Sequence, residues 1–120
     1  MRAIRGAICA ENTKESILTR TRELLDEIFL VNGLEVLQVV AITFTCTKDL
    51  DAVYPAQAAR EAGILEASLM CVAEMDAQGS MQGIVRVQML VEMDVPQSAV
   101  RHVYLGRAAG LRPDLAGSKE

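Results

Sequence analysis

The chain has 120 residues, enough for one domain, and 51% of them are hydrophobic, enough for a buried core. Its formal net charge is −4 and only 3% of its residues are aromatic, which argues against the basic, base-stacking surface of a nucleic-acid-binding protein.

The cysteines and the histidine argue against several kinds of site. Cys9, Cys46 and Cys71 are odd in number and form no Cys-x-x-Cys motif, and His102 is the only histidine. We therefore expect no disulfide scaffold and no zinc or other metal site. The longest uncharged run, Val36–Thr47, is well short of the ~20 apolar residues of a spanning helix. Since strand-like sequence stands where a signal peptide would, we expect a cytoplasmic protein that enters no membrane.

Residues 2–10 predict a strand. Ala3, Arg5 and Ala7 share one face, so Arg5 projects among small residues with room to reach outward. Gly6 beside it indicates either a close approach of a ligand or of backbone, or a bulge.

A long helix and a second strand follow. Asn12 and Glu15 resemble a capping box, and the apolar spacing after them predicts an amphipathic helix that ends at Asn32-Gly33. Residues 38–47 alternate as a strand with three threonines on one face. A helix, another subunit or solvent could cover that face.

Residues 55–63 predict a short helix with Pro55 at its first position and Gly63 at its end. The free N–H groups at its start suit an anion, with Arg60 one turn further on. A plain surface helix with Arg60 paired to a carboxylate is the alternative. A short strand over residues 67–72 follows.

The longest strand pattern runs from Val85 to Met93, with apolar residues on one face and Arg86 on the other. The glycine-containing loop before it carries Glu74 close to Cys71. Arg86 is therefore a cation on rigid backbone beside a thiol and a carboxylate, a layout that suits a small, oriented anion. Taken alone, Arg86 could equally be solvated or paired with a surface carboxylate.

The remaining segments complete the fold class. Residues 94–97 predict a turn with a brief helical start and residues 101–105 a strand, and no helix is expected immediately before Pro113. We expect a polar tail, residues 116–120, to fray. The elements predict an α/β (α+β) fold, a single domain over residues 1–115 with a mixed β-sheet and a helical layer. So few strands leave one face and the edges uncovered, which favours an oligomer.

Several segments together resemble the monofunctional, trimeric α/β class of chorismate mutase, and not the all-helical class. They follow the family's order with compatible spacing: Ile4–Ala7, Ala52–Ala56, Cys71–Asp76, Ile84–Val87, Asp94–Gln97, Arg101–Leu105 and Leu111–Leu115. The last two segments, Arg-His-Val-Tyr-Leu and Leu-Arg-Pro-Asp-Leu, are the most specific. The resemblance implies a pseudo-barrel homotrimer with active sites at the clefts between subunits.

The implied reaction is the Claisen rearrangement of chorismate to prephenate, an isomerase step that leads from the shikimate pathway toward phenylalanine and tyrosine. The substrate is a dianion, and negative charge grows on its ether oxygen because the C–O bond breaks ahead of C–C bond formation. No nucleophile, metal or cofactor is needed. Catalysis would come from holding a chair-like conformer and from a fixed positive charge at that oxygen.

The resemblance also implies roles for particular residues. Arg86 would face the ether oxygen and a carboxylate, and Arg5 and Tyr104 would bind a substrate carboxylate. Glu74 and the Cys71 region would hold the ring hydroxyl. Further positions would line the cleft or bring the C-terminal segment over its mouth: Tyr54, Ala56, Gln57, Arg60, Leu69, Met70, Leu111 and Arg112.

Two positions depart from the family pattern. Tyr54 stands where Phe is familiar, and Gln57 stands where some relatives carry Lys, so the cleft would attract the dianion less at long range. Two other functions fit a small α/β trimer. One is an enamine or imine deaminase with an arginine at an intersubunit cleft, and the other is a non-catalytic trimer that senses a carboxylate.

Overall fold

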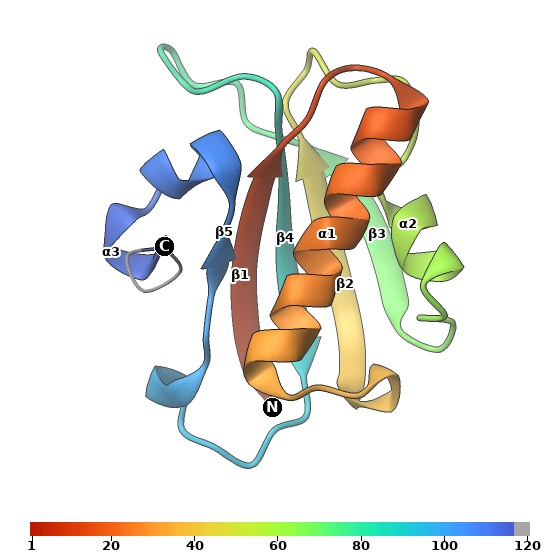
Figure 1. Cartoon of the computed structure of the whole chain (residues 1–120), viewed down its shortest axis with the longest axis vertical. Helices are drawn as coiled ribbons and strands as arrows, with labels where there is room; N and C mark the ends of the chain where they lie inside the picture. Colours follow the sequence, from red (N-terminus) through yellow and green to blue (C-terminus); the bar gives the residue numbers. More distant parts are fainter. Residues whose placement is uncertain (117–120) are drawn as a thin grey trace.

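The computed structural model describes residues 1–116, which form a five-stranded sheet with two helices on one of its faces (Figure 1). In chain order the strands and helices are β1 (Arg2–Cys9), α1 (Lys14–Asn32), β2 (Val39–Cys46), α2 (Ala56–Glu61), β3 (Ser68–Ala73), β4 (Ile84–Val91), β5 (Val103–Tyr104) and α3 (Pro113–Ala116). Short 3-10 turns lie at Val36–Gln38, Gln97–Ala99 and Gly106–Gly110.

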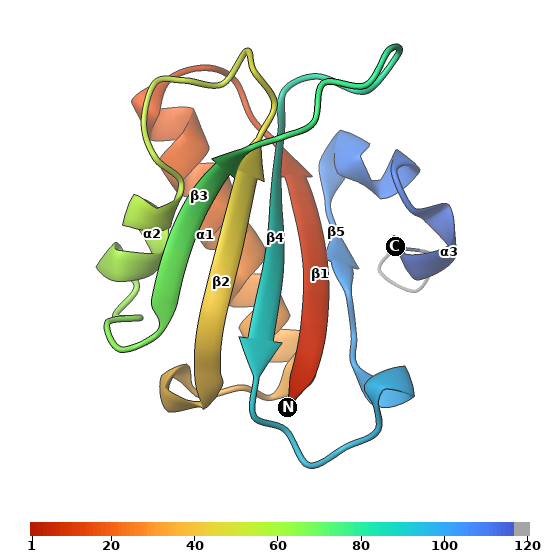
Figure 2. The same ribbon diagram turned by 180° about the vertical axis from the view of Figure 1, so that it is seen from behind.

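The sheet is mixed, as the sequence predicts. Its strand order is β3-β2-β4-β1-β5, with β4 in the middle. β4 pairs with β1 and β2 in antiparallel fashion, whereas the outer pairs β1–β5 and β2–β3 are parallel. Seen from behind, the strands lie in front of α1, and within residues 1–116 no helix covers this second face (Figure 2).

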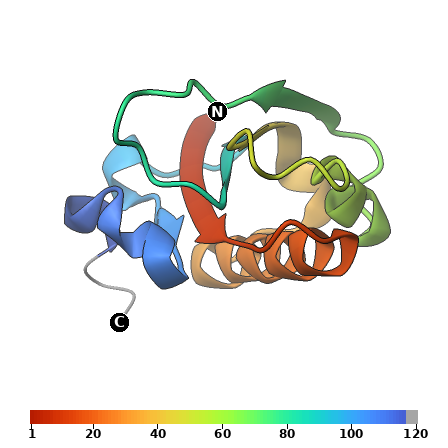
Figure 3. The same ribbon diagram turned by 90° about the horizontal axis from the view of Figure 1, so that it is seen from above.

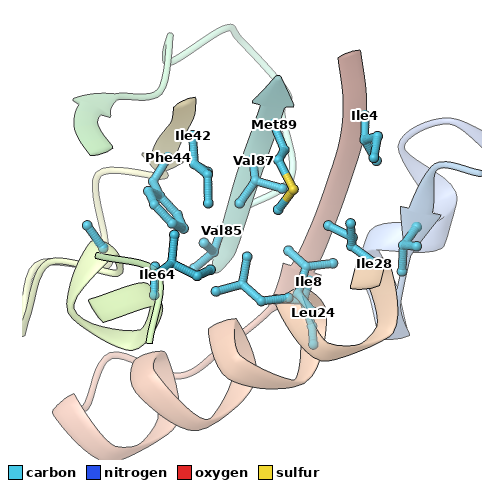
Figure 4. Packing of buried hydrophobic residues seen from close by; sticks show 14 of the residues in the cluster. Ile4, Ile8, Leu24, Ile28, Ile42, Phe44, Ile64, Val85, Val87 and Met89 are labelled. Atoms are coloured by element: carbon cyan, nitrogen blue, oxygen red, sulfur yellow. The ribbon is translucent and has the colours of Figure 1, made fainter. Parts of the chain in front are cut away.

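The core lies between α1 and the sheet (Figures 3 and 4). The predicted apolar stripe of α1 is buried, with Leu24 and Ile28 at 0% exposure. It packs on the face of the sheet that presents Ile4 of β1, Phe44 of β2 and Met89 of β4, each also at 0% exposure. The predicted alternation of β1 and β4 is therefore confirmed. Each such burial stabilises the fold by about 1.5–3 kcal/mol.

The capping box expected at Asn12 and Glu15 is wrong. The helix is capped by Thr13, whose Oγ1 accepts a hydrogen bond of 3.0 Å from the N–H of Ser16. The side-chain oxygen of Asn12 instead accepts from the N–H groups of Asp51 and Ala52, at 2.9 and 3.0 Å. Asn12 therefore holds the loop between β2 and α2, a long-range contact that local spacing does not reveal.

The C-terminal end of α1 and the position of Gly6 follow the sequence. Gly33 ends the helix in the left-handed conformation, with φ 61°. At Gly6 an added Cβ would lie 3.1 Å from the Cδ1 atoms of Leu24 and Ile28, and 3.0 Å from the carbonyl oxygen of Val103. The β1–β4 register runs through Gly6 without a shift. Gly6 is thus a close approach of α1 and β5, and not a bulge.

The C-terminal region is more helical than expected. The predicted strand over residues 101–105 is reduced to Val103–Tyr104, and a 3-10 turn at Gly106–Gly110 follows it. A short helix, α3, begins at Pro113, and the residues immediately before it are not helical, as expected. Of the tail expected at residues 116–120, Ala116 is the last residue of α3, and residues 117–120 lie outside the described part of the chain.

Among residues 1–116 there is no helix with both the length and the apolar character that crossing a membrane requires.

Candidate active site

The uncovered face of the sheet carries a row of polar and charged side chains. Arg86 on β4 is paired with Thr45 on β2 and with Ala7 on β1, and Ala7 is paired with Tyr104 on β5. Residues that are directly paired across strands point to the same face. Arg5, two residues before Ala7, lies on this face as well. Four strands, β2, β4, β1 and β5, therefore contribute side chains to one surface. Figure 2 shows these strands side by side on the uncovered face of the sheet.

A cleft of about 300 Å³ lies over this row. Its polar lining comes from β1, β2, β4, β5 and the loop after β3: Arg5, Thr43, Thr45, Glu74, Arg86, Gln88 and Tyr104. The structure thus brings together four of the five residues to which the sequence resemblance gives catalytic roles. The exception is Cys71.

Arg86 and Glu74 lie beside each other in the cleft. Nε of Arg86 is 3.8 Å from Oε1 of Glu74, and the Arg86 side chain is 42% exposed. Thr45 donates a hydrogen bond to the same carboxylate oxygen, and the Glu74 N–H donates to the carbonyl of Cys46 at 3.1 Å. β2 therefore fixes both the main chain and the side chain of Glu74, while most of the five N–H donors of Arg86 stay available to a ligand.

Arg5 adds a second positive charge, and among residues 1–116 it makes no ion pair. Two guanidinium groups beside one carboxylate make the cleft attractive to anions. The N–H of Arg5 donates to Nδ1 of His102 at 2.9 Å. Partial burial, together with the positive charges of Arg5 and Arg112, lowers the pKa of His102.

Tyr104 forms the far wall of the cleft. Its ring is 4% exposed and packs with Ala7, Ile84 and Ala108, and Leu111 packs against the same cluster. The guanidinium of Arg112 donates two hydrogen bonds to the carboxylate of Asp114, at 3.1 and 2.8 Å. This pair raises the pKa of Arg112 and lowers the pKa of Asp114. Leu111 therefore packs against the cluster that holds Tyr104 and does not itself line the cleft, while Arg112 is paired with a carboxylate of its own segment.

Tyr54 and Cys71 line a different cavity, of about 630 Å³, at the β2–β3 side of the sheet. No lining residue is shared between this cavity and the cleft of Arg86. Tyr54 is 74% exposed. Cys46 also lines the cavity, and burial above all, with the neighbouring Cys71 and acidic groups, raises the pKa of its thiol to about 11.

The remaining predicted cleft residues also lie away from Arg86 in a single copy of the chain. On α2, Ala56 is buried, Gln57 donates to Glu61 at 3.0 Å, and Arg60 is exposed. On β3, Leu69 packs against the core, while Met70 points from the uncovered face with 58% exposure.

Sequence reasoning did not assign Thr43, Thr45 or Gln88 to the site, although all three line the cleft. A signal was present, because the two threonines alternate with the buried Phe44 and must share the opposite face. What the alternation lacks is any indication that β4 and its Arg86 pair with this strand.

Comparisons with known proteins agree on one family. Residues 1–115 match the family model described as "Chorismate mutase type I". The chain is 43% identical to the chorismate mutase AroH of Bacillus subtilis, with 99% of this chain and 95% of the relative covered. It is 42% identical to the chorismate mutase AroH of Thermus thermophilus, with 99% of both chains covered.

A solved chorismate mutase from Clostridium thermocellum is similar in fold, with a TM-score of 0.88 and 44% identity, over 90% of this chain and 97% of that one. These matches support the mutase resemblance and not the deaminase alternative. The chain belongs to the chorismate mutase type I family.

Proposed function

We propose that the chain catalyses the Claisen rearrangement of chorismate to prephenate, the isomerase step toward phenylalanine and tyrosine. One observation carries this proposal: a cleft of about 300 Å³ in which Arg5 and Arg86 stand beside Glu74 and Tyr104. Two cations and one carboxylate suit a ligand with two carboxylates and a hydroxyl group. The similarity to the two AroH chorismate mutases supports the same activity.

The reaction moves electrons within a single molecule, so the protein needs to supply only shape and charge. Binding in a compact, chair-like conformer removes the entropy cost of folding the substrate up in solution. As the C–O bond of the allyl vinyl ether breaks, negative charge gathers on the oxygen. A guanidinium already in place beside it stabilises the transition state more than the ground state.

Within the cleft we assign the ether oxygen to Arg86, which projects from the central strand and has a single, 3.8 Å ion pair among the described residues. Arg5 and Tyr104 bind a substrate carboxylate. Thr45 holds Glu74 in one orientation, and Glu74 accepts a hydrogen bond from the ring hydroxyl. The main chain near Cys71 also contacts this hydroxyl. No metal or cofactor takes part in this scheme.

A second copy of the chain completes the cleft. Tyr54, Arg60 and Met70 do not reach Arg86 within one chain, and Met70 is 58% exposed on the uncovered face of the sheet. Val72 on the same face is 42% exposed, and such apolar area favours contact with another protein surface.

We infer a homotrimer in which the segments around Tyr54 and Met70 of one copy meet the cleft of the next. In this arrangement Gln57 and Arg60 face the substrate from α2, and the buried Ala56 and the half-buried Leu69 shape the surface behind them. Leu111 and Arg112 close the mouth of the cleft. The three cysteines are free, which supports a reducing, cytoplasmic location.

The test is to mix the purified protein with chorismate, follow the loss of the diene absorbance, and identify prephenate by NMR. We expect saturable turnover with kcat nearly flat around neutral pH, since no proton is transferred. A steep bell-shaped pH profile would indicate acid–base chemistry instead. Binding of chorismate without turnover would support the carboxylate sensor, and an absence of both would contradict the proposal. Light scattering on the same sample measures the number of copies.

A further inference from the structure

β5 is shorter than β1, and beyond its two residues side chains bond the outer edge of β1 in place of a strand. β5 spans only Val103–Tyr104, and the backbone bond next to it runs from the N–H of Leu105 to the carbonyl of Ala7 at 2.9 Å. Two residues earlier on β1, the N–H of Arg5 donates to Nδ1 of His102 at 2.9 Å.

At Ala3 the side-chain amide of Gln97 both donates and accepts, at 2.7 and 3.1 Å. Side-chain hydrogen bonds from Gln97 and His102 thus extend the row of backbone hydrogen bonds that β5 makes with β1.

His102 is itself held on both sides. The main chain of Arg101 bonds Asn32 at the end of α1, with its N–H donating to Oδ1 and its carbonyl accepting from Nδ2, both at 2.9 Å. On the other side, Val103 pairs with Gly6. The main chain on both sides of His102 is therefore held, by α1 before it and by β1 after it, and the imidazole itself bonds the N–H of Arg5. To accept a hydrogen bond at Nδ1, it must be neutral and carry its proton on Nε2.

We propose that His102 is a positioning residue for Arg5: its neutral imidazole fixes the main chain at Arg5 and thereby the direction of the Arg5 guanidinium in the cleft. This rests on the proposed function, in which Arg5 binds a substrate carboxylate. The effect of a displaced guanidinium is large, because errors of about 1 Å in a bound group can cost ~10²-fold in rate.

Burial and two nearby positive charges favour the neutral form of His102. Burial lowers the pKa of His102 most, and the positive charges of Arg5 on β1 and Arg112 before α3 lower it further, so this pKa lies below the usual 6.5. The neutral form is favoured in the folded state, so its contribution to stability is complete above about pH 6.5 and is lost as the pH falls toward the lowered value. Protonation would also remove the acceptor for Arg5. We expect kcat/KM to fall on the same acid side.

Three variants separate positioning from general support of the strand edge. His102→Asn places an oxygen near the position of Nδ1 that accepts a hydrogen bond and takes no proton. His102→Leu keeps an apolar volume but removes the acceptor. Gln97→Leu breaks the equivalent side-chain bonds at Ala3 and is the matched control. Each is measured for Tm and for kcat and KM of the chorismate reaction between pH 5 and pH 8.

We expect His102→Leu to lose between ~10-fold and ~10²-fold in kcat/KM at pH 7.5, chiefly through a higher KM. Gln97→Leu should lower Tm but stay within about two-fold of the original kcat/KM, since Ala3 carries no group into the cleft. His102→Asn should retain most activity at pH 7.5 and lose the acid-side decline.

Three results would overturn the inference: near-normal kcat/KM in His102→Leu, an equal loss in Gln97→Leu, or an unchanged acid-side decline in His102→Asn. If His102→Leu does not fold, the pH profile of His102→Asn still decides. Failure of the proposed function itself would be seen separately, as an absence of turnover by the unmodified chain or as no effect of Arg5→Ala.

Discussion

The guanidinium of Arg86 projects from the middle strand of the sheet and has one carboxylate, Glu74, at 3.8 Å. Its pre-set position is the main source of transition-state stabilisation in the proposed mechanism. We expect Arg86→Ala to lower kcat by ~10²–10³-fold or more, the loss typical of one oxyanion-stabilising donor. Steady-state kinetics with chorismate measure this directly, and turnover near the original level would remove Arg86 from its proposed role.

Arg86→Lys is the matched control for charge. Lysine keeps the positive charge but replaces the planar fork of N–H donors with a single ammonium group. It should therefore also lose most of the activity. If Arg86→Lys were fully active, charge alone would explain catalysis and the geometry of the fork would not matter.

Cys46 offers a residue-scale test of the second cavity. Burial raises the pKa of its thiol to about 11, so at pH 8 roughly one thiol in a thousand is ionised. Because only the thiolate reacts, iodoacetamide should modify Cys46 far more slowly in the folded protein than in the unfolded chain at the same pH. Mass spectrometry of the Cys46 peptide follows both rates, and equal rates would contradict the buried, protonated thiol.

At the scale of elements, the spacing between α1 and the sheet depends on Gly6. A methyl group there would lie 3.1 Å from Leu24 and Ile28 and 3.0 Å from the carbonyl of Val103, which cannot move without disturbing β5. We expect Gly6→Ala to lower the free energy of unfolding by about 1–3 kcal/mol, the usual cost of overpacking. Denaturant titration at one fixed protein concentration measures it.

Gly110 provides the control for this substitution. Its φ is not positive, and an added Cβ would meet nothing closer than Cε of Met81 at 3.8 Å. Gly110→Ala should therefore be neutral or slightly stabilising, by up to about 1 kcal/mol, because alanine restricts the unfolded chain. Equal destabilisation by both substitutions would show that backbone freedom, and not the contact with α1, explains glycine at position 6.

The elements that periodicity defines could be predicted from the sequence, and those that depend on distant partners could not. Val85, Val87 and Met89 alternate with Arg86 because one face of β4 is buried, so both the strand and its polar face follow from the pattern. The helix cap was misplaced by one residue because Asn12 bonds a loop far along the chain.

The site residues also divide into those that local sequence indicates and those that depend on distant partners. Arg5, Glu74, Arg86 and Tyr104 could be named from short motifs, and the strand order brings them into one cleft. Nothing local indicates that β4 lies between β1 and β2, so the cleft contributions of Thr45 and Gln88 were not predicted. Nor could one chain show how Tyr54 and Arg60 would reach the substrate in the proposed trimer, because that depends on contacts between copies.

At the scale of the whole molecule, an experiment can test whether Arg86 and Arg60 of one active site come from the same copy of the chain or from two copies. Arg86→Ala should inactivate the cleft on the open face, and Arg60→Ala should remove the guanidinium that α2 is proposed to contribute. If each active site takes Arg86 from one copy and Arg60 from another, a mixed trimer contains some sites in which both arginines are intact. For random exchange of equal amounts, on the order of a quarter of the sites should recover.

The measurement is chorismate turnover after the two variants are mixed, unfolded and refolded together. Each variant carried through the same treatment alone gives the baseline, and the unmodified chain gives the refolding yield. Activity that rises well above both baselines would establish a cleft shared between copies. Activity equal to the average of the two baselines would mean that Arg86 and Arg60 act within one chain, because no arrangement of the mixed copies could then restore an intact site.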